Sequence, residues 1–407
     1  MKVLYVTGAN LTKNTSANMS HNGYVQGLIE NGCDVDIIMA ADSWGTSDQA
    51  LPMWKQAKYY IYNSISFADR LKSRLKKTEK ISVAPSAAQS VSDSAVKNKQ
   101  SLRSYAKKAF YTIFPQDPLY PLHKTWLNSA KKFQSDKEYD IVISNSSPSA
   151  SHTLVMELIE KKHIHFKRWV QIWEDPWYYD IYGGLSEAVR DEEHRLLRAA
   201  SEIYYVSPLT LMYQKQYFSD CAEKMKYIPL PAFEYEDSDV IHDGEVKFGY
   251  FGDYYSRTRN LQPFYDAMIS CNASGYIYGD TDLALESTEK VTVHGRTTLD
   301  KLAGIQGQTD VLIHLCNLRG GQIPGKIYHY SMTDKPIVFI LDGTPDEQTE
   351  LKRIFENYKR YIFCENTVAS IAEVLRVLSD RVYLKKYKPV DAFKPEVIAE
   401  QLLADRL

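Results

Sequence analysis

Two arginines follow closely on a predicted strand that ends in glycine. They belong to the segment FGYFGDYYSRTRN, residues 248–260, in which Gly252 and Tyr255 precede Arg257 and Arg259. A guanidinium group can bind two phosphate oxygens at once, and loops at the carboxyl ends of strands are where α/β domains bind nucleotides. The segment therefore predicts a contact with a nucleotide diphosphate. The alternative is a pair of solvated arginines.

A glycine-rich segment further along the chain has the features of a second anion-binding element. It reads RGGQIPGKIYHYSMTDKPIV, residues 319–338. Glycines let backbone N–H groups approach a ligand, and Pro324 suits the first turn of a helix. The N-terminus of such a helix is positive, and Lys326 adds a formal charge there. The alternative for Lys326 is a solvated helix residue.

Other chemical motifs are weak or missing. The segment Gly279-Asp280-Thr281-Asp282 contains the Asp-x-Asp pattern that can hold Mg²⁺ or Mn²⁺, but a Gly-Asp turn after a strand also has an ordinary structural reason. We expect no metal there. No GxGxxG, Walker A, GxSxG or HExxH motif is present, and the first turn, Gly8-Ala9-Asn10, lacks the glycine spacing for NAD. His163 and His165 are interpreted as a polar helix end, not as metal ligands.

Predicted strands and helices alternate along the chain in two series. The first series has strands at 3–6, 35–39, 140–144, 168–172 and 202–207, with helices at 18–30, 149–162 and 186–200. The second has strands at 246–251, 275–279, 291–295, 311–315 and 337–340. Prolines and acidic residues between the series predict a linker. Two such series imply two doubly wound α/β domains, with ligands in a cleft between them.

The composition shows no overall excess of either charge. Among 407 residues, 49 Lys and Arg stand against 51 Asp and Glu, which gives a net charge of −2. This balance argues against a dedicated nucleic-acid-binding protein. No apolar run approaches the ~18 residues that span a bilayer, and the N-terminal apolar stretch is too short for a signal peptide. Five scattered cysteines indicate reduced thiols, so we expect a cytoplasmic protein.

The region 70–108 departs from this balance. It holds eleven Lys and Arg against two acidic residues, a local net charge of +9, and its Ser/Ala-rich centre predicts a partly mobile insertion. One interpretation is an ordinary solvated loop and helix face. The other is a surface that contacts anionic lipid headgroups or a lipid-linked phosphate acceptor, which would place the protein peripherally on the inner face of the cell membrane.

At these motifs the sequence resembles the GT-B glycosyltransferases, in particular the glycosyltransferase family 4-like enzymes of bacterial surface polysaccharides. The segments 250–260 and 293–315 resemble strands and loops of their donor domain. GGQIPGKIYHYSMTDKPIV, residues 320–338, resembles their IPxK…EY…KPI donor motif. In the N-terminal half, DIVISNSSPSASH (140–152) and WVQIWEDPW (169–177) resemble their acceptor-domain strands.

The resemblance implies a GT-B fold, in which two Rossmann-like domains face each other across a cleft. Residues 1–230 would form an acceptor-binding domain, 231–245 a linker, 246–390 a nucleotide-sugar-binding domain and 391–407 a C-terminal helix. The implied reaction moves a sugar from a nucleotide-sugar donor to a glycan or lipid-linked acceptor. The resemblance further implies retention of anomeric configuration and no metal or other cofactor.

The resemblance also implies which residues form the site. Arg257 or Arg259, together with Lys326, would neutralise the leaving diphosphate. Glu174 or Asp175 would orient or deprotonate the acceptor hydroxyl, although Asp175 could equally cap its turn. The remaining donor-binding candidates are Gly252, Tyr255, Gly279, Gly320, Gly321, Gln322, Ile323, Pro324 and His329. The acceptor-binding candidates are Asn18, His21 and Trp177.

One pair of positions departs from the family pattern. Its members often carry two glutamates eight positions apart in the donor motif, and these positions hold Gly321 and His329 here. An imidazole can still hydrogen-bond a ribose hydroxyl. The departure leaves two alternatives: a non-catalytic GT-B-like protein that binds a glycan or a partner, and a sugar-nucleotide epimerase, since that chemistry also occurs on this fold.

Overall fold

The computed structural model describes most of the chain: residues 1–43, 46–47, 51, 53–64, 121–181, 186–233 and 244–404. The predicted basic insertion at 70–108 and most of the predicted linker at 231–245 lie outside these residues. By the contacts among its residues, the chain divides into two compact units. The first combines Met1–Asn18 with Asp34–Glu202, and the second combines Met19–Cys33 with Ile203–Leu407.

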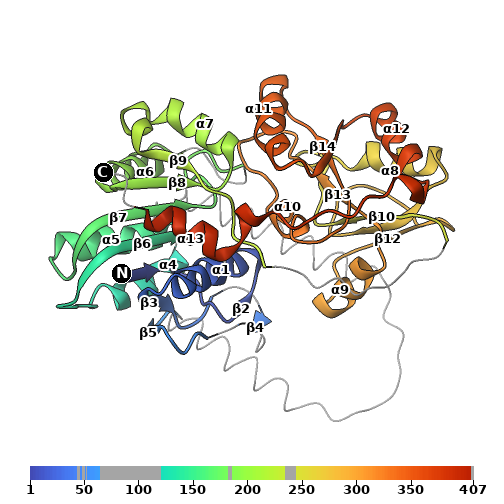
Figure 1. Ribbon diagram of the computed structural model, residues 1–407. Helices are drawn as coiled ribbons and strands as arrows, with labels where there is room; N and C mark the ends of the chain where they lie inside the picture. The colour runs from blue at the N-terminus through green and yellow to red at the C-terminus, as the bar shows by residue number, and fades with distance from the viewer. Residues whose placement is uncertain are drawn as a thin grey trace, which may run out of the picture. The chain divides into compact units, whose positions relative to one another are not determined.

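The first sheet has seven strands and begins at the N-terminus. Its strands are β1 (Lys2–Val6), β3 (Asp34–Ala40), β5 (Lys58–Tyr62), β6 (Glu138–Ser146), β7 (His165–Trp173), β8 (Glu202–Tyr205) and β9 (Met225–Tyr227). They lie in the order β5-β3-β1-β6-β7-β8-β9 (Figure 1). The pairs β3–β5, β1–β3, β1–β6, β6–β7 and β8–β9 are all parallel. The strands of the first predicted series are thus confirmed.

Helices and short elements connect these strands. They are β2 (Lys13–Asn14), α1 (Ser16–Glu30), β4 (Thr46–Ser47), α4 (Pro121–Ala130), α5 (Ala150–Glu160), α6 (Glu187–Ala199), α7 (Pro208–Tyr217) and the 3-10 turn η1 (Ser219–Lys224). Helix α7 begins with Pro208 after Ser207, whose hydroxyl accepts the amide of Thr210 and caps the helix. The three helices predicted in this half are present as α1, α5 and α6.

The second sheet has six strands, all parallel. They are β10 (Lys247–Phe251), β11 (Ser274–Tyr278), β12 (Val291–His294), β13 (Val311–Leu315), β14 (Ile337–Leu341) and β15 (Tyr361–Glu365). Their order is β12-β11-β10-β13-β14-β15, so the direction of the chain across the sheet reverses between β10 and β13. In open α/β sheets, ligands bind beyond the carboxyl ends of the strands at such a reversal. The five predicted strands are confirmed.

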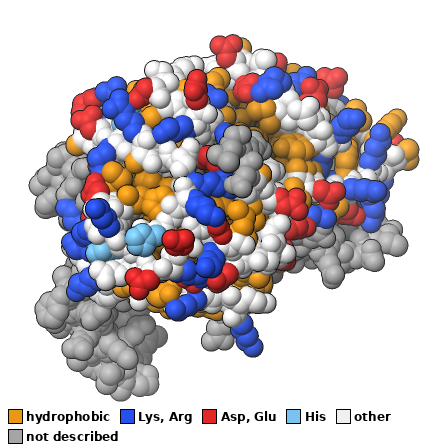
Figure 2. Space-filling model, turned by 60° about the vertical axis from the view of Figure 1, so that its left-hand side comes forward, with side chains coloured by type: hydrophobic (Ala, Val, Ile, Leu, Met, Phe, Trp, Pro, Cys, Tyr) orange, Lys and Arg blue, Asp and Glu red, His pale blue; other side chains and the backbone are white. Residues whose placement is uncertain are grey.

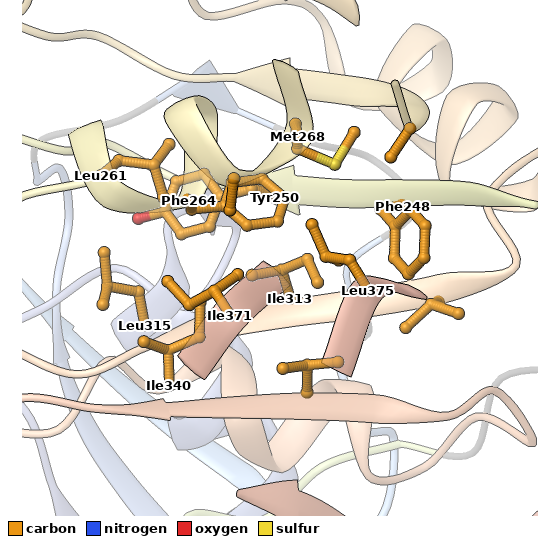
Figure 3. Close-up of a cluster of buried hydrophobic side chains, with 14 of the residues drawn as sticks. Phe248, Tyr250, Leu261, Phe264, Met268, Ile313, Leu315, Ile340, Ile371 and Leu375 are labelled. Atoms are coloured by element: carbon orange, nitrogen blue, oxygen red, sulfur yellow. The ribbon is translucent and has the colours of Figure 1, made fainter. Parts of the chain in front are cut away.

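Helices α8 (Gln262–Ser270) and α12 (Val368–Leu378) cover one face of this second sheet. Figure 3 shows Phe264 and Met268 of α8 beside Leu375 of α12, over Tyr250 of β10 and Ile313 of β13. Since the side chains of parallel strands alternate between the two faces, the neighbouring positions point the other way. On that other face the ring of Phe339 (β14) lies 5.0 Å from the ring of Phe355.

The remaining elements of the second unit complete its layers. They are α9 (Leu299–Gly307), α10 (Lys326–Tyr330), α11 (Pro345–Phe355), η2 (Glu356–Tyr358), η3 (Arg381–Tyr383), η4 (Asp391–Phe393) and α13 (Pro395–Leu403). Helix α13 lies where the sequence predicts a final helix. None of the described helices combines the length and the apolar character that crossing a bilayer requires. On the face seen in Figure 2, basic and acidic side chains are interspersed.

Candidate functional site

The loops after β10 and β13 hold the predicted arginines and the glycine-rich segment. The two strands are parallel neighbours, so both loops lie at the same edge of the sheet. Arg259 is half-buried, and its Nε and Nη2 donate to Oδ1 of Asn317 at 3.1 and 2.8 Å. Its Nη1 donates to the carbonyl of Asp253 at 2.9 Å. Arg257 is exposed, so Arg259 is the arginine that these loops orient.

Asn317 connects the arginine loop to the glycine-rich loop. It is buried, and while its Oδ1 accepts from Arg259, its Nδ2 donates to the carbonyl of Gln322 at 2.8 Å. The adjacent amide of Leu318 donates to the carbonyl of Thr258 at 2.8 Å. Sequence analysis did not single out Asn317. Its position could have indicated a role, because Asn317 follows directly after the apolar run of β13. In open parallel sheets, ligands bind beyond the carboxyl ends of the strands.

We expect Asn317→Ala to weaken the binding of nucleoside diphosphates about tenfold, because Arg259 and the Gln322 carbonyl both lose their shared partner. Asn317→Asp keeps an acceptor for Arg259 and loses only the bond to Gln322, so its effect should be smaller. Titration calorimetry on the two variants measures both dissociation constants. Equal affinity in Asn317→Ala and the unmodified protein would contradict this role.

Lys326 places a cation at the end of the glycine-rich loop. Its ammonium group makes no hydrogen bond or ion pair with any residue in the described part of the chain. Burial lowers the pKa of Lys326 to about 8, and the charges of Arg259 and Arg296 act in the same direction, against the opposing effect of Asp253. Helix α10 has only five residues, so its dipole is small. The positive charge at this point is therefore mainly that of Lys326.

Four further charged residues come from the loops after β10, β11 and β12. The guanidinium of Arg296 binds the carboxylate of Asp253 through both Nε and Nη2, with Nε 2.9 Å from Oδ1, and lies 3.3 Å from Asp280. Burial raises the pKa of Asp253, but Arg296 and the amide of Asp280 lower it by more. Asp282 instead accepts the amide and hydroxyl of Ser256 at 2.7 and 2.8 Å. The two carboxylates of the Asp-x-Asp pattern thus bind different partners.

Close backbone contacts explain two of the predicted glycines. The carbonyl of Gly321 accepts the hydroxyls of Ser207 and Thr210, the latter at 2.8 Å. A Cβ at Gly321 would lie 2.8 Å from the backbone N and Cα of Thr210, so a glutamate cannot occupy this position without moving backbone. A Cβ at Gly279 would lie 1.8 Å from the carbonyl oxygen of Gly252. Position 321 therefore has no room for a glutamate side chain in this backbone.

The other donor-side candidates contribute little additional charge. His329 is half-buried on α10, and burial followed by the charge of Lys326 lowers its pKa to about 4, so its imidazole is neutral at pH 7. Gln322 is buried, while Ile323 and Pro324 are half-buried. Gly252 donates its amide to the carbonyl of Tyr278, Gly320 has a φ of +84° that favours glycine, and Tyr255 is exposed.

The first unit groups polar side chains at the ends of β1, β6 and β7. Asn145 donates from Nδ2 to the hydroxyl of Tyr5 at 2.8 Å, and both are fully buried. Glu174 and Asp175 follow β7 and are half-buried. Burial raises the pKa of Tyr5, the hydrogen bond with Asn145 lowers it in part, and the charge of Glu174 raises it. Tyr5 and Asn145 were not among the sequence candidates.

The three predicted acceptor-binding residues are all buried. Asn18 donates from Nδ2 to the carbonyls of Asn10 and Lys13 at 2.9 and 2.8 Å, so it shapes the loop after β1. His21 lies on α1 with no exposed surface, and Trp177 is 7% exposed. The structure thus gives Asn18 a role in holding a loop, whereas a direct contact of these side chains with an acceptor remains a prediction.

Glu193 holds the turn that contains Trp177 and was missed by sequence analysis. Its carboxylate, fully buried on α6, accepts the amides of Tyr178 at 2.7 Å and Trp177 at 3.4 Å. Burial raises the pKa of Glu193 to about 7, although these two hydrogen bonds act in the opposite direction. A local signal was available, because Glu193 lies four positions after Val189 and four before Leu197, on the apolar face of α6.

The raised pKa of Glu193 predicts a pH-dependent contribution to stability. The folded state binds this proton more tightly than the unfolded state, so the contribution is complete below about pH 4.5 and is lost as the pH rises to about 7. Relative to Glu193→Gln, the unmodified protein should lose about 3 kcal/mol of unfolding free energy over that interval. Urea denaturation at several pH values measures this difference, and parallel pH profiles for the two proteins would rule out the effect.

Comparisons with known proteins place the fold. No protein-family model matches the chain, and no curated protein does. Among solved structures, S. aureus TarM, in complex with Fondaparinux, alpha-GlcNAc-glycerol and UDP, aligns over 98% of this chain and 95% of its own, with 10% identity and a TM-score of 0.54. AviGT4, a glycosyltransferase involved in avilamycin A biosynthesis, aligns over 99% and 96%, with 10% identity and a TM-score of 0.50.

The fold is that of the GT-B glycosyltransferases. A putative UDP-N-acetylglucosamine 2-epimerase from Listeria monocytogenes also aligns, over 99% of this chain and 94% of its own, with 9% identity and a TM-score of 0.48. The two parallel sheets, together with the alignments to TarM and AviGT4, confirm the expected fold class of two parallel-sheet α/β domains. In this GT-B chain the loops after β10 and β13 carry Arg259, Asn317 and Lys326 at the edge where α/β sheets bind ligands.

Proposed function

We propose that the protein is a glycosyltransferase that moves a sugar from a nucleotide-sugar donor to a glycan or lipid-linked acceptor in the cytoplasm. The wider proposal includes a role in bacterial polysaccharide biosynthesis, retention of anomeric configuration and no requirement for a metal. The resemblance of the donor motif and the GT-B fold support it. The partners that Asp280 and Asp282 already bind, Arg296 and Ser256, agree with a reaction that does not use these carboxylates as metal ligands.

The environment of Lys326 is the observation that carries this proposal. The half-buried ammonium group forms no ion pair with any described residue. The nearby carboxylate of Asp253 binds Arg296 instead, so an anionic ligand would compensate the charge of Lys326. Arg259 lies close enough to lower the pKa of Lys326 by its charge, and Asn317 fixes the orientation of that guanidinium. Two cations held at the ligand edge of a parallel sheet fit a diphosphate better than a neutral ligand.

In the proposed reaction, the bond between the anomeric carbon and the diphosphate oxygen breaks and a bond to the acceptor oxygen forms. Negative charge develops on the leaving diphosphate, and Lys326 and Arg259 would stabilise it in the transition state. The acceptor hydroxyl loses its proton, and Glu174 or Asp175 would orient that hydroxyl or receive the proton.

The two substrates can be tested separately. We expect at least one nucleoside diphosphate from a panel of UDP, GDP, ADP and dTDP to raise the melting temperature, because a ligand that binds only the folded state stabilises it. The matching nucleotide-sugars should then release free nucleotide faster when an acceptor glycan is added. Protection by a glycan but by no nucleotide would favour a non-catalytic protein. A changed sugar nucleotide without any acceptor would favour an epimerase.

A further inference from the structure

We propose that the segment Asp380–Lys388, which follows α12, docks onto the surface of an anionic lipid bilayer. This segment was not singled out in the sequence and lies far along the chain from the basic region 70–108. It contains η3 and reads DRVYLKKYK. The inference stands on the exposure, the rigidity and the charge of this segment, and it does not depend on the proposed transferase activity.

Apolar side chains are unusually exposed here. Val382 is 84% exposed, more than any other large hydrophobic side chain in the described ranges. Tyr383 beside it is 56% exposed, and Val377, at the end of α12, is 50% exposed. Single exposed hydrophobic residues are common on protein surfaces, but here three lie within seven residues of the chain, and we refer to them as the apolar patch.

The turn that presents these side chains is firmly held. The carboxylate of Asp380 accepts the amide of Val382 at 3.0 Å, and the carbonyls of Asp380 and Arg381 accept the amides of Tyr383 and Leu384, also at 3.0 Å. The guanidinium of Arg381 donates to Asp310 at 3.1 Å and to the carbonyl of Gly244 at 2.8 Å. The exposure of Val382 and Tyr383 is thus a property of an ordered turn.

Basic residues flank the exposed apolar residues in the sequence. The segment carries Arg381, Lys385, Lys386 and Lys388 against Asp380, a net charge of +3 in a chain whose total is −2. Arg381 and Lys386 are paired with Asp310 and Asp334. Lys385 and Lys388 are exposed and form no ion pair with any residue that the structure describes.

Exposed apolar side chains next to lysines fit an anionic bilayer better than a second copy of the same chain. Tyrosine favours the headgroup level of a membrane, small apolar side chains enter just below it, and lysines are attracted to anionic headgroups. A second copy of the chain would bring an identical set of lysines to a two-fold contact, and like charges across an interface repel. Charge complementarity therefore favours lipid as the occupant.

Vesicle binding tests the proposal in the full-length chain. We compare vesicles of phosphatidylcholine alone with vesicles that contain phosphatidylglycerol, by co-sedimentation at low and high salt. The unmodified protein should bind the anionic vesicles and release them as the salt concentration rises. Val382→Ser with Tyr383→Ser, and separately Lys385→Glu with Lys388→Glu, should each lower the partition coefficient about fivefold or more.

Matched controls make the same chemical changes elsewhere in the second unit. Ile269→Ser with Val368→Ser removes two other exposed apolar side chains, and Lys301→Glu with Lys352→Glu reverses two other exposed lysines. These variants should bind like the unmodified protein. Because the region 70–108 is identical in all of them, any binding that it contributes cancels in the comparison.

Several results would overturn the proposal. They are the absence of binding to anionic vesicles, equal loss in the test and control pairs, and unchanged binding in both test pairs. Sedimentation velocity tests the alternative that the patch binds a second copy of the chain. If the unmodified protein is a dimer that dissociates in the Val382→Ser, Tyr383→Ser variant, the patch is a dimer interface and the lipid proposal is wrong.

Discussion

Lys326→Ala is expected to lower turnover by more than tenfold while the protein stays folded. The ammonium group is half-buried and unpaired among the described residues, so its removal costs the fold little and leaves the developing charge of the diphosphate with Arg259 alone. Steady-state kinetics with a nucleotide-sugar and an acceptor measure kcat and KM. A loss mainly in kcat would show that the interaction strengthens in the transition state.

The pH dependence of kcat/KM provides a second test of the role of Lys326. Since the pKa of Lys326 is about 8, its charged form prevails below that pH, and kcat/KM should fall about tenfold per unit as the pH rises above it. Lys326→Arg keeps the charge at higher pH, so it should remove this alkaline decline even if its maximal rate is lower. Lys352→Ala, at an exposed lysine of α11, serves as the matched control and should behave like the unmodified protein. Full turnover in Lys326→Ala would exclude Lys326 from the site.

Gly321→Glu, which restores the residue common in the resembling family, is expected to damage the protein. The new Cβ would lie 2.8 Å from the backbone N and Cα of Thr210, which cannot move as a flexible side chain can. Overpacking of this kind costs roughly 1–3 kcal/mol, so the melting temperature should fall by roughly 5 °C. Displacement of the glycine-rich loop should also lower nucleotide binding about tenfold or more, since Gln322 would move away from Asn317.

Two further variants separate the steric cause from the added charge. Gly321→Ala adds only the Cβ and should already lower the melting temperature. Gly304→Ala, in helix α9 where a Cβ meets no atom within 4 Å, should leave it unchanged or raise it slightly. If Gly321→Ala melts with the unmodified protein and Gly321→Glu gains activity, the close contact with Thr210 does not decide this position.

Most of the framework could be predicted from local sequence. The apolar runs that became β1, β3, β10, β13 and β14 are buried on both faces, and such strands produce a strong signal within five residues. Strand β15 was not predicted, because it lies at the edge of the sheet and its residues Tyr361, Ile362 and Phe363 are only partly buried. Short β9 carries too few residues for any periodicity.

The site was predicted less completely, because its contacts join residues far apart in sequence. Arg259 and Asn317 are 58 residues apart, and the hydroxyl of Thr210 reaches Gly321 across 111 residues. No spacing rule connects such pairs. The resemblance alone implied that Asn18 contacts the acceptor, and the hydrogen bonds of its amide to the loop carbonyls of Asn10 and Lys13 became evident only in the structure.

The amino-acid sequence by itself determined the two alternating series of elements, the separation of chemistry into an arginine loop and a glycine-rich loop, and the cation at position 326. These follow from hydrophobic periodicity and from backbone preferences, which act over a few neighbouring residues. Only the tertiary structure decided that Arg259 and not Arg257 is oriented by Asn317, and that Gly321 has no room for a glutamate. Packing between distant segments decides burial and hydrogen-bond partners, and with them the charge state of each group.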